Sequence, residues 1–247
     1  MTSRLLLLFA RALSGPLLPQ RSDRHARWVL WGIAALFLTI GWIGEGRAED
    51  VIGARPLLTI APKDLHTILP SDSHILIDPR ALEQFLDALD KIPPDWGLVY
   101  GHGHDDPTHD ERLFTLNRER DAKRAGNSAL TQRITFVWLG ELSRYDSEAG
   151  GFRIALGPVL TPTRWGVVRF KCEDLPGNLV AKVSSTMQSE LEQRLARGEP
   201  VDLTVAMTGR LIPDESVVYD FSHDQEGVGV IMPVVKVERL DYLLTKK

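Results

Sequence analysis

The spacing of apolar residues changes once along the chain, and the change separates two kinds of predicted structure. Between about residues 78 and 126, apolar residues recur with the 3.6-residue period of helices, whereas after residue 132, apart from one interruption, they alternate with the period of two that half-buried strands show. A separate uncharged apolar run over residues 28–44 precedes both regions. We therefore expect an α+β protein with helices first and a β-rich domain second.

Two short helices are predicted between residues 78 and 131. In the first, Asp78 is a suitable N-cap and Pro79 a suitable first helical residue. Its apolar positions share one face and are Leu82, Phe85, Leu86 and Leu89. The second helix begins at Thr108, which can form a capping box with Glu111. It carries few apolar residues, so we expect it to bury only a narrow stripe.

Strands and one further helix are predicted from residue 132 onward. The strand ranges are 133–143, 151–157, 164–171, 201–209, 216–221 and 229–239. A helix over about 185–197, with Ser185 and Gln188 as its capping box, lies between the third and fourth strands. Along the fourth strand Leu203 and Val205 should face the core, while Thr204 should face away from it.

Three strands, a helix and two or three further strands make up the element order of an OB-type barrel. On that order, residues 132–240 resemble the OB-fold-like small β-barrels of exported bacterial proteins of unknown function, and the strings LFTLNRERD and WGVVRFKCEDLP are similar to strings in secreted bacterial families. The resemblance implies a small OB-like antiparallel β-barrel with one inserted helix, preceded by two short helices and an N-terminal signal or transmembrane helix. It implies no activity, because this architecture binds many unrelated ligands.

The apolar run 28–44 predicts export, because five arginines precede it and only Arg47 follows it closely. A helix of this length spans about 25 Å, which is short for a membrane span and also suits a signal peptide. Gly46 and Ala48 fit the small-residue positions of a cleavage site. Two alternatives stay open: an inner-membrane anchor through 28–44, or secretion after cleavage near Ala48. Both predict a periplasmic location.

The expected domain organisation follows from these patterns. It comprises a signal peptide or membrane anchor (1–48), an extended proline-containing lead-in (49–77), a helical segment (78–131) and an OB-like β-barrel domain (132–247). The formal charge is −4, and because six arginines and two acids give residues 1–48 a charge of +4, the remainder carries −8. So acidic an exported domain is not expected to bind nucleic acid.

Basic and aromatic side chains predict one candidate ligand-binding surface on the barrel. These residues are Arg144, Tyr145, Arg153, Arg164, Trp165, Arg169 and Lys171. In OB-type barrels, the face formed by the second and third strands and the neighbouring loops binds ligands. The alternative is that these long side chains only cover the barrel surface.

A histidine cluster over residues 100–111 is a second candidate. His102, His104 and His109 stand among several aspartates, and imidazoles at positions i and i+2 can converge on one zinc ion. The string resembles the H-x-H-x-D-H run of metallo-β-lactamase-type hydrolases, except that Pro107 takes the place of the closing histidine. The alternative is a solvated loop before the second helix.

No nucleophile elbow, P-loop or dinucleotide fingerprint is present in the sequence, so we predict no catalytic residues and no cofactor. The predicted function is that of an exported envelope protein acting as a binding or scaffolding module for an envelope protein or a small ligand. The alternative is a metal-dependent hydrolase that uses the loop of His102, His104 and His109.

Overall fold

The computed structural model describes residues 53–61, 64–102, 106–212, 215, 217–222 and 225–245. The predicted apolar helix 28–44 and the predicted cleavage site near Ala48 lie outside these residues. Within the described ranges, no helix has the length and apolarity that a membrane span requires.

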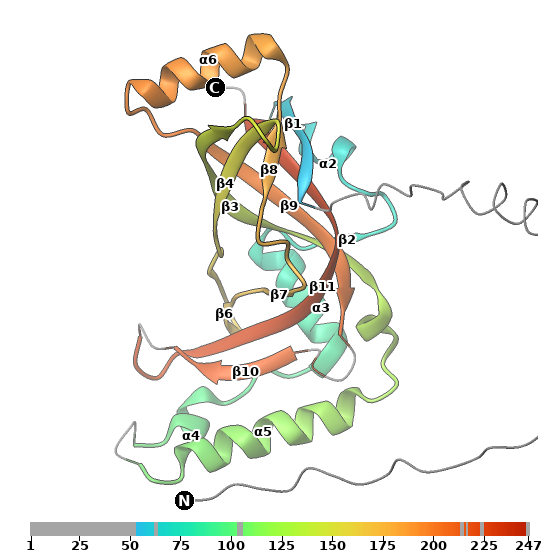
Figure 1. Cartoon of the computed structure of the whole chain (residues 1–247). Coiled ribbons are helices and arrows are strands. Elements are labelled where there is room, and N and C mark those ends of the chain that lie inside the picture. Colours follow the sequence, from blue (N-terminus) through green and yellow to red (C-terminus); the bar gives the residue numbers. More distant parts are fainter. Residues whose placement is uncertain are drawn as a thin grey trace, which may run out of the picture. The chain divides into compact units, whose positions relative to one another are not determined.

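Six strands form a closed barrel (Figure 1). In order around the barrel these are β1 (Ala54–Ile60), β8 (Val180–Lys182), β4 (Gly151–Gly157), β3 (Arg133–Asp146), β9 (Asp202–Leu211) and β11 (Gly229–Thr245). Pairing between β11 and β1 closes the ring. The prediction of an α+β protein built around a small β-barrel is therefore confirmed.

The barrel is mixed, and this corrects the prediction that it is antiparallel. Neighbouring strands among β8, β4, β3, β9 and β11 pair antiparallel, but β1 runs parallel to both of its neighbours, β8 and β11. β1 lies in the segment expected to be an extended lead-in. Its exposed Pro56 and Leu58 surround the buried Leu57, so no alternation of polar and apolar residues marks it as a strand.

The predicted third strand, 164–171, is wrong. This region forms three short strands, β5 (Thr161–Thr163), β6 (Gly166–Val168) and β7 (Lys171–Glu173), and the side chain of Trp165 between them is fully buried. β6 and β7 run parallel to β11 outside the closed ring. The barrel position expected for the third strand belongs instead to β8, which follows a further loop.

Predictions for the other strands agree with the structure in position. β4 has the predicted bounds, while β3, β9 and β11 extend beyond theirs, β11 as far as Thr245. On β9 the predicted parity is confirmed at Leu203 and Val205, which are buried. Register places Val205 beside Trp138 of β3 and Tyr242 of β11, so these side chains share the interior face.

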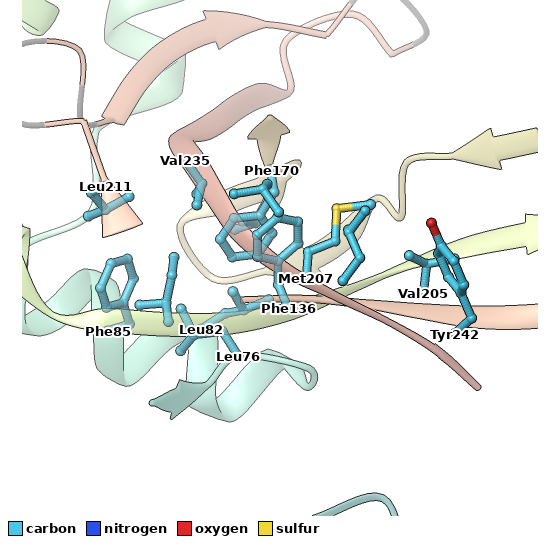
Figure 2. Close-up of a cluster of buried hydrophobic side chains, with 14 of the residues drawn as sticks. Leu76, Leu82, Phe85, Phe136, Phe170, Val205, Met207, Leu211, Val235 and Tyr242 are labelled. Carbon is cyan, nitrogen blue, oxygen red and sulfur yellow. The ribbon is translucent and has the colours of Figure 1, made fainter. Parts of the chain in front are cut away.

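Helix α3 (Pro79–Asp90) supplies a large part of the apolar core. Asp78 caps it by accepting a hydrogen bond from the N–H of Ala81 (3.0 Å), and the four predicted apolar residues are buried. Figure 2 shows Leu82 and Phe85 in the same buried cluster as Phe136 and Phe170, whose rings stack at 4.1 Å. Burying each such side chain contributes about 1.5 to 3 kcal/mol.

The remaining helices differ from the predictions mainly at their ends. In α6 (Ser185–Ala196), which lies at one end of the barrel in Figure 1, the N-cap is Ser184 rather than Ser185. In α5 (His109–Arg124) the predicted capping box does not form, because Thr108 bonds to Asp106 and Arg112 instead. The short elements that the sequence did not predict are α2 (Leu65–Ile68), β2 (His74–Ile75), α4 (Trp96–Tyr100) and the 3-10 helix η2 (Ser128–Thr131).

The first part of β11 extends beyond the barrel and forms a second, smaller sheet. Its strands lie in the order β10 (Val217–Phe221), β11, β6 and β5, which we call the small sheet. Helices α4 and α5 lie beneath the β10–β11 hairpin in Figure 1. The small sheet therefore has one face against helices and one face turned away from them.

Candidate ligand-binding site

A pocket of about 470 Å³ lies on the face of the small sheet that is turned away from the helices. We call it the sheet pocket. Its lining residues are Leu160, Pro162, Thr163, Gly166, Val167, Arg169, Asp220, Phe221, Ser222, Gln225, Val228, Val230 and Met232. This volume falls within the range typical of small-molecule sites, and the lining combines apolar side chains with a few polar groups, as such sites usually do.

Strand alternation explains why these residues line the pocket. Val230 and Met232 of β11 are half-buried and line it, whereas Ile231 between them is fully buried on the opposite face. Val167 of β6 and Asp220 of β10 both pair with Val230 of β11, one on each side of it. One continuous face therefore runs across three strands, with an apolar strip at its centre.

A tryptophan supports the small sheet from behind. The indole N–H of Trp96 donates a hydrogen bond to the carbonyl oxygen of Trp165 (2.6 Å), and its ring packs near Tyr219 and Phe221 of β10. A Cβ atom at Gly229 would lie only 1.8 Å from the Trp96 ring, so this strand position requires glycine. The close approach fixes the position of α4 relative to the sheet that carries the pocket.

A buried charge network holds β10 to helices α3 and α5. The guanidinium of Arg124 donates to the carboxylate of Asp90 through Nε (2.7 Å) and Nη2, and to the carbonyl oxygen of Val217 (2.9 Å). The hydroxyl of Tyr219 also donates to Asp90. Since the side chains of Asp90 and Arg124 are 0% and 1% exposed, this pair is fully removed from solvent.

The pKa directions agree with this description of the network. Burial and then the neighbouring charge of Asp90 raise the pKa of Tyr219 well above its usual value. Burial is the largest single effect on the pKa of Arg124 and lowers it, but the hydrogen bonds and charges of Asp90 and Tyr219 together outweigh burial, and the net shift is upward. The phenol therefore stays neutral and the guanidinium stays charged, as their hydrogen bonds require.

Asn117 of α5 occupies the outer edge of β10. Its amide nitrogen donates to the carbonyl oxygen of Tyr219 (2.8 Å), and its amide oxygen accepts from the N–H of the same residue (2.8 Å). The side chain thus completes backbone hydrogen bonds that an edge strand otherwise leaves open. Together with Trp96 and Arg124, it makes β10 a fixed wall of the sheet pocket.

Two charged groups in the sheet pocket form no ion pair with any residue in the described part of the chain. Arg169 is exposed and makes no side-chain hydrogen bond or ion pair with any residue that the structure describes. The carboxylate of Asp220 accepts a hydrogen bond from the N–H of Phe221 (2.8 Å) and forms no ion pair within the described ranges. Unpaired charges beside an apolar strip are available to a ligand.

Most of the seven predicted ligand-binding residues are occupied elsewhere. Arg153 pairs with Asp146 (2.6 Å), Lys171 pairs with Glu173 (2.9 Å), and Arg164 pairs with the two acids Glu83 and Asp87 of α3. These contacts fit the alternative interpretation, in which long side chains cover the barrel and pair with its acids. They do not form one basic strip.

Trp165 and Tyr145 are also unsuited to stacking on a ligand from the surface. Trp165 is fully buried, and its indole N–H donates to Asp87 (3.1 Å). Tyr145 is half-buried and packs edge-to-face on Phe152, with ring centroids 5.2 Å apart. Arg144 is exposed and lines a shallower groove beside the end of α6. Only Arg169 of the predicted set lies in the sheet pocket.

The described part of the histidine loop is held by its own hydrogen bonds. Asp106 accepts from Arg112 (2.8 Å) and from the N–H of Thr108 (3.0 Å), and the contact with Arg112 holds the pKa of Asp106 well below its usual range. His109 is half-buried, with Nδ1 2.8 Å from the carbonyl oxygen of Asp106 and its ring against Phe221. His104 lies outside the described residues.

Within the part of the chain that the structure describes, no three His, Cys, Asp or Glu side chains are grouped so that they could hold a metal ion. Comparison with known proteins returned no matching family model, no matching curated protein and no matching solved structure. We therefore infer function from the pocket itself.

Proposed function

We propose that the protein is an exported envelope protein that binds a small amphipathic ligand with an anionic group in the sheet pocket. The observation that carries the proposal is Arg169, which has no side-chain partner among the described residues, beside the apolar strip of Val167, Val230 and Met232 in a pocket of about 470 Å³. The apolar strip can bury the apolar part of such a ligand, and the guanidinium of Arg169 can bind its anionic group. Export is supported by the arginine asymmetry around residues 28–44.

The finer fold assignment that we propose is an OB-type barrel with one added strand. Without β1, the strands β3, β4, β8, β9 and β11 and the helix α6 between β8 and β9 follow the OB-type element order. The loop between the fourth and fifth strands of OB-type barrels contributes to their ligand sites, and here the corresponding region contains β10, one wall of the sheet pocket. This correspondence favours binding over catalysis.

A binding experiment tests the site. Octanoate, which joins an apolar chain to a carboxylate, is titrated into the purified protein by calorimetry. We expect Arg169→Gln to weaken binding by about tenfold, the loss of one charge-assisted hydrogen bond. Arg144→Gln is the matched control, because Arg144 is also an exposed arginine without a described partner but lies in another groove. Equal binding by both variants and the unaltered protein would disprove the proposed site.

A fusion experiment tests the location. Alkaline phosphatase joined after residue 60 should be active, since the enzyme matures only outside the cytoplasm. A fluorescent cytoplasmic reporter at the same point, combined with silent phosphatase, would refute export.

The metal-dependent hydrolase ranks second. It requires His102, His104 and His109 to share an ion, whereas His109 Nδ1 and the Asp106 carboxylate already have partners within the loop. Metal analysis of the untagged protein tests it. One equivalent of zinc, lost in the double variant His102→Ala with His104→Ala, would promote this alternative over the ligand-binding proposal.

A further inference from the structure

The sheet pocket contains two opposite charges, and their separation restricts the ligand further than the proposed function does. Arg169 and Asp220 both line the pocket, and neither forms an ion pair with the other or with any other described residue. A purely anionic ligand would be attracted by Arg169 and repelled by Asp220. A ligand with a charge of each sign would be attracted by both groups.

The strand register gives the spacing of the two residues along the backbone of the sheet. Asp220 pairs with Val230 on one flank of β11, and on the other flank the N–H of Arg169 donates to the carbonyl oxygen of Ile231 (2.9 Å). The two residues therefore stand two strand spacings apart across the sheet, which is about 10 Å. Between them lies the apolar strip whose central residues are Val230 and Met232.

We infer that the sheet pocket binds a short zwitterionic apolar peptide with free ends, its carboxylate at Arg169 and its ammonium at Asp220. An extended chain advances about 3.3 to 3.6 Å per residue, so three residues span about the two strand spacings that separate Arg169 from Asp220. Apolar side chains along the peptide lie on the apolar strip. This inference rests on the proposed function of the sheet pocket and specifies its ligand class.

Free amino acids and long peptides fit this arrangement less well. The charges of a free amino acid are too close together to reach both Arg169 and Asp220. A long peptide with one end in the pocket places its other charge far from the second group. The separation of the two residues on the sheet therefore selects for the length of the peptide as well as for its apolar character.

Four versions of one tripeptide test the inference on the full chain by calorimetry. The probes are alanyl-leucyl-alanine with free ends, the N-acetylated form, the C-amidated form and the form blocked at both ends. We expect the free peptide to bind most tightly and each single block to weaken binding by about tenfold, because each removes one charge-assisted interaction. The doubly blocked peptide should bind most weakly.

Two charge-neutralising variants assign each end of the peptide to its residue. With Arg169→Gln, amidation of the carboxylate should no longer matter, while acetylation still weakens binding. With Asp220→Asn the pattern should reverse. Both residues are at least partly exposed, and circular dichroism checks that each variant stays folded. A doubly blocked peptide that binds as tightly as the free one overturns the inference.

The octanoate experiment separates failure of the inference from failure of the proposed function. The inference is overturned, and the anion site stands, if octanoate binds in a manner that depends on Arg169 but no tripeptide binds. The same conclusion follows if neither acetylation of the peptide nor Asp220→Asn changes the affinity for the tripeptide. If neither octanoate nor any tripeptide binds, both proposals are overturned. If the two variants exchange their predicted effects, the orientation of the peptide is wrong and the inference as stated fails.

Discussion

Replacing Asp90 by asparagine tests whether the buried charge network holds the helices to the small sheet. The substitution preserves the shape of the side chain but removes its charge. Arg124, with 1% of its side chain exposed, then keeps its charge without its buried partner. One acceptor oxygen also becomes an NH₂ group that faces the donors Arg124 and Tyr219.

The expected cost is about 3 to 5 kcal/mol, the range found when one partner of a buried ion pair is removed. Asp121→Asn provides the matched control, since Asp121 contacts the same guanidinium at 3.2 Å but its side chain is 57% exposed. Solvent screening limits the contribution of such a pair, and the control should lose less than about 1 kcal/mol.

Urea unfolding of the two variants and the unaltered chain measures the difference, with tyrosine and tryptophan fluorescence as the signal. The midpoint should fall strongly for Asp90→Asn and little for Asp121→Asn, with similar slopes in all three proteins. Losses within 0.5 kcal/mol of each other, as a rough experimental error, would refute the account, because they would mean that burial of the Asp90 pair has no energetic consequence.

Three further predictions concern other parts of the molecule. Burial raises the pKa of Cys172 to about 12, so the contribution of this thiol to folding stability is complete below the unfolded pKa of about 8.5 and declines as the pH rises toward 12. At pH 8 a thiol reagent should therefore modify the native protein at least about a hundredfold more slowly than the urea-unfolded chain. Equal rates of modification would contradict this prediction. Gly229→Ala should displace Trp96 and lower the free energy of unfolding by at least about 1 to 3 kcal/mol, measured by thermal or urea unfolding. The tryptophan emission should also shift to longer wavelength. An unchanged spectrum together with unchanged stability would argue against the contact between Gly229 and Trp96. Leu203→Ala should cost about 2 to 5 kcal/mol in urea unfolding and Thr204→Ala less than about 1, whereas equal losses would show that the interior face of β9 is assigned wrongly.

Local patterns in the sequence were sufficient to predict several elements. Helix α3 was predicted because a cap, an N-terminal proline and four apolar residues at helical spacing all agree, and the structure confirms each of these features. Strands β4 and β9 were predicted because apolar and polar residues alternate along part of each, in β9 over Asp202–Val205, although Ala206, Met207 and Thr208 beyond it are all buried. In these elements, the information that determines the structure lies within the element itself.

The sequence did not reveal the elements that depend on distant partners. β1 lacks alternation and becomes a strand through its parallel neighbours, one of which brings Tyr242 beside Leu57. In the predicted third strand, alternation over WGVVRF suggested one continuous strand, but burial of Trp165 against α3 breaks it into short pieces. Tertiary contacts determine the strand structure in both segments, and no local sequence pattern indicates these contacts.

The candidate site, like these strands, could be predicted from the sequence only in part. Arg169 was predicted as a ligand-binding residue, but for a strip that the structure does not form. Asp220 and Met232 were missed because they join Arg169 only through the pairing of β10, β11 and β6. A sequence signal for Asp220 exists in principle, since aspartate is depleted in strands, but it does not identify the partner across the sheet.

The seam between β1 and β11 has a consequence for folding kinetics. It joins the first and last described strands, and the hydroxyl of Tyr242 donates to the carbonyl oxygen of Gly53 across 189 positions of sequence. Contacts of such large sequence separation slow folding, because the entropy of closing the loop must be overcome before the contact forms. A chain that emerges with its N-terminus first cannot complete this seam until β11 has emerged. If the protein is exported as we propose, the ring therefore closes only after β11 has crossed the membrane, and until then β1 and β9, the two neighbours of β11, expose unpaired edges to any chaperone that meets them.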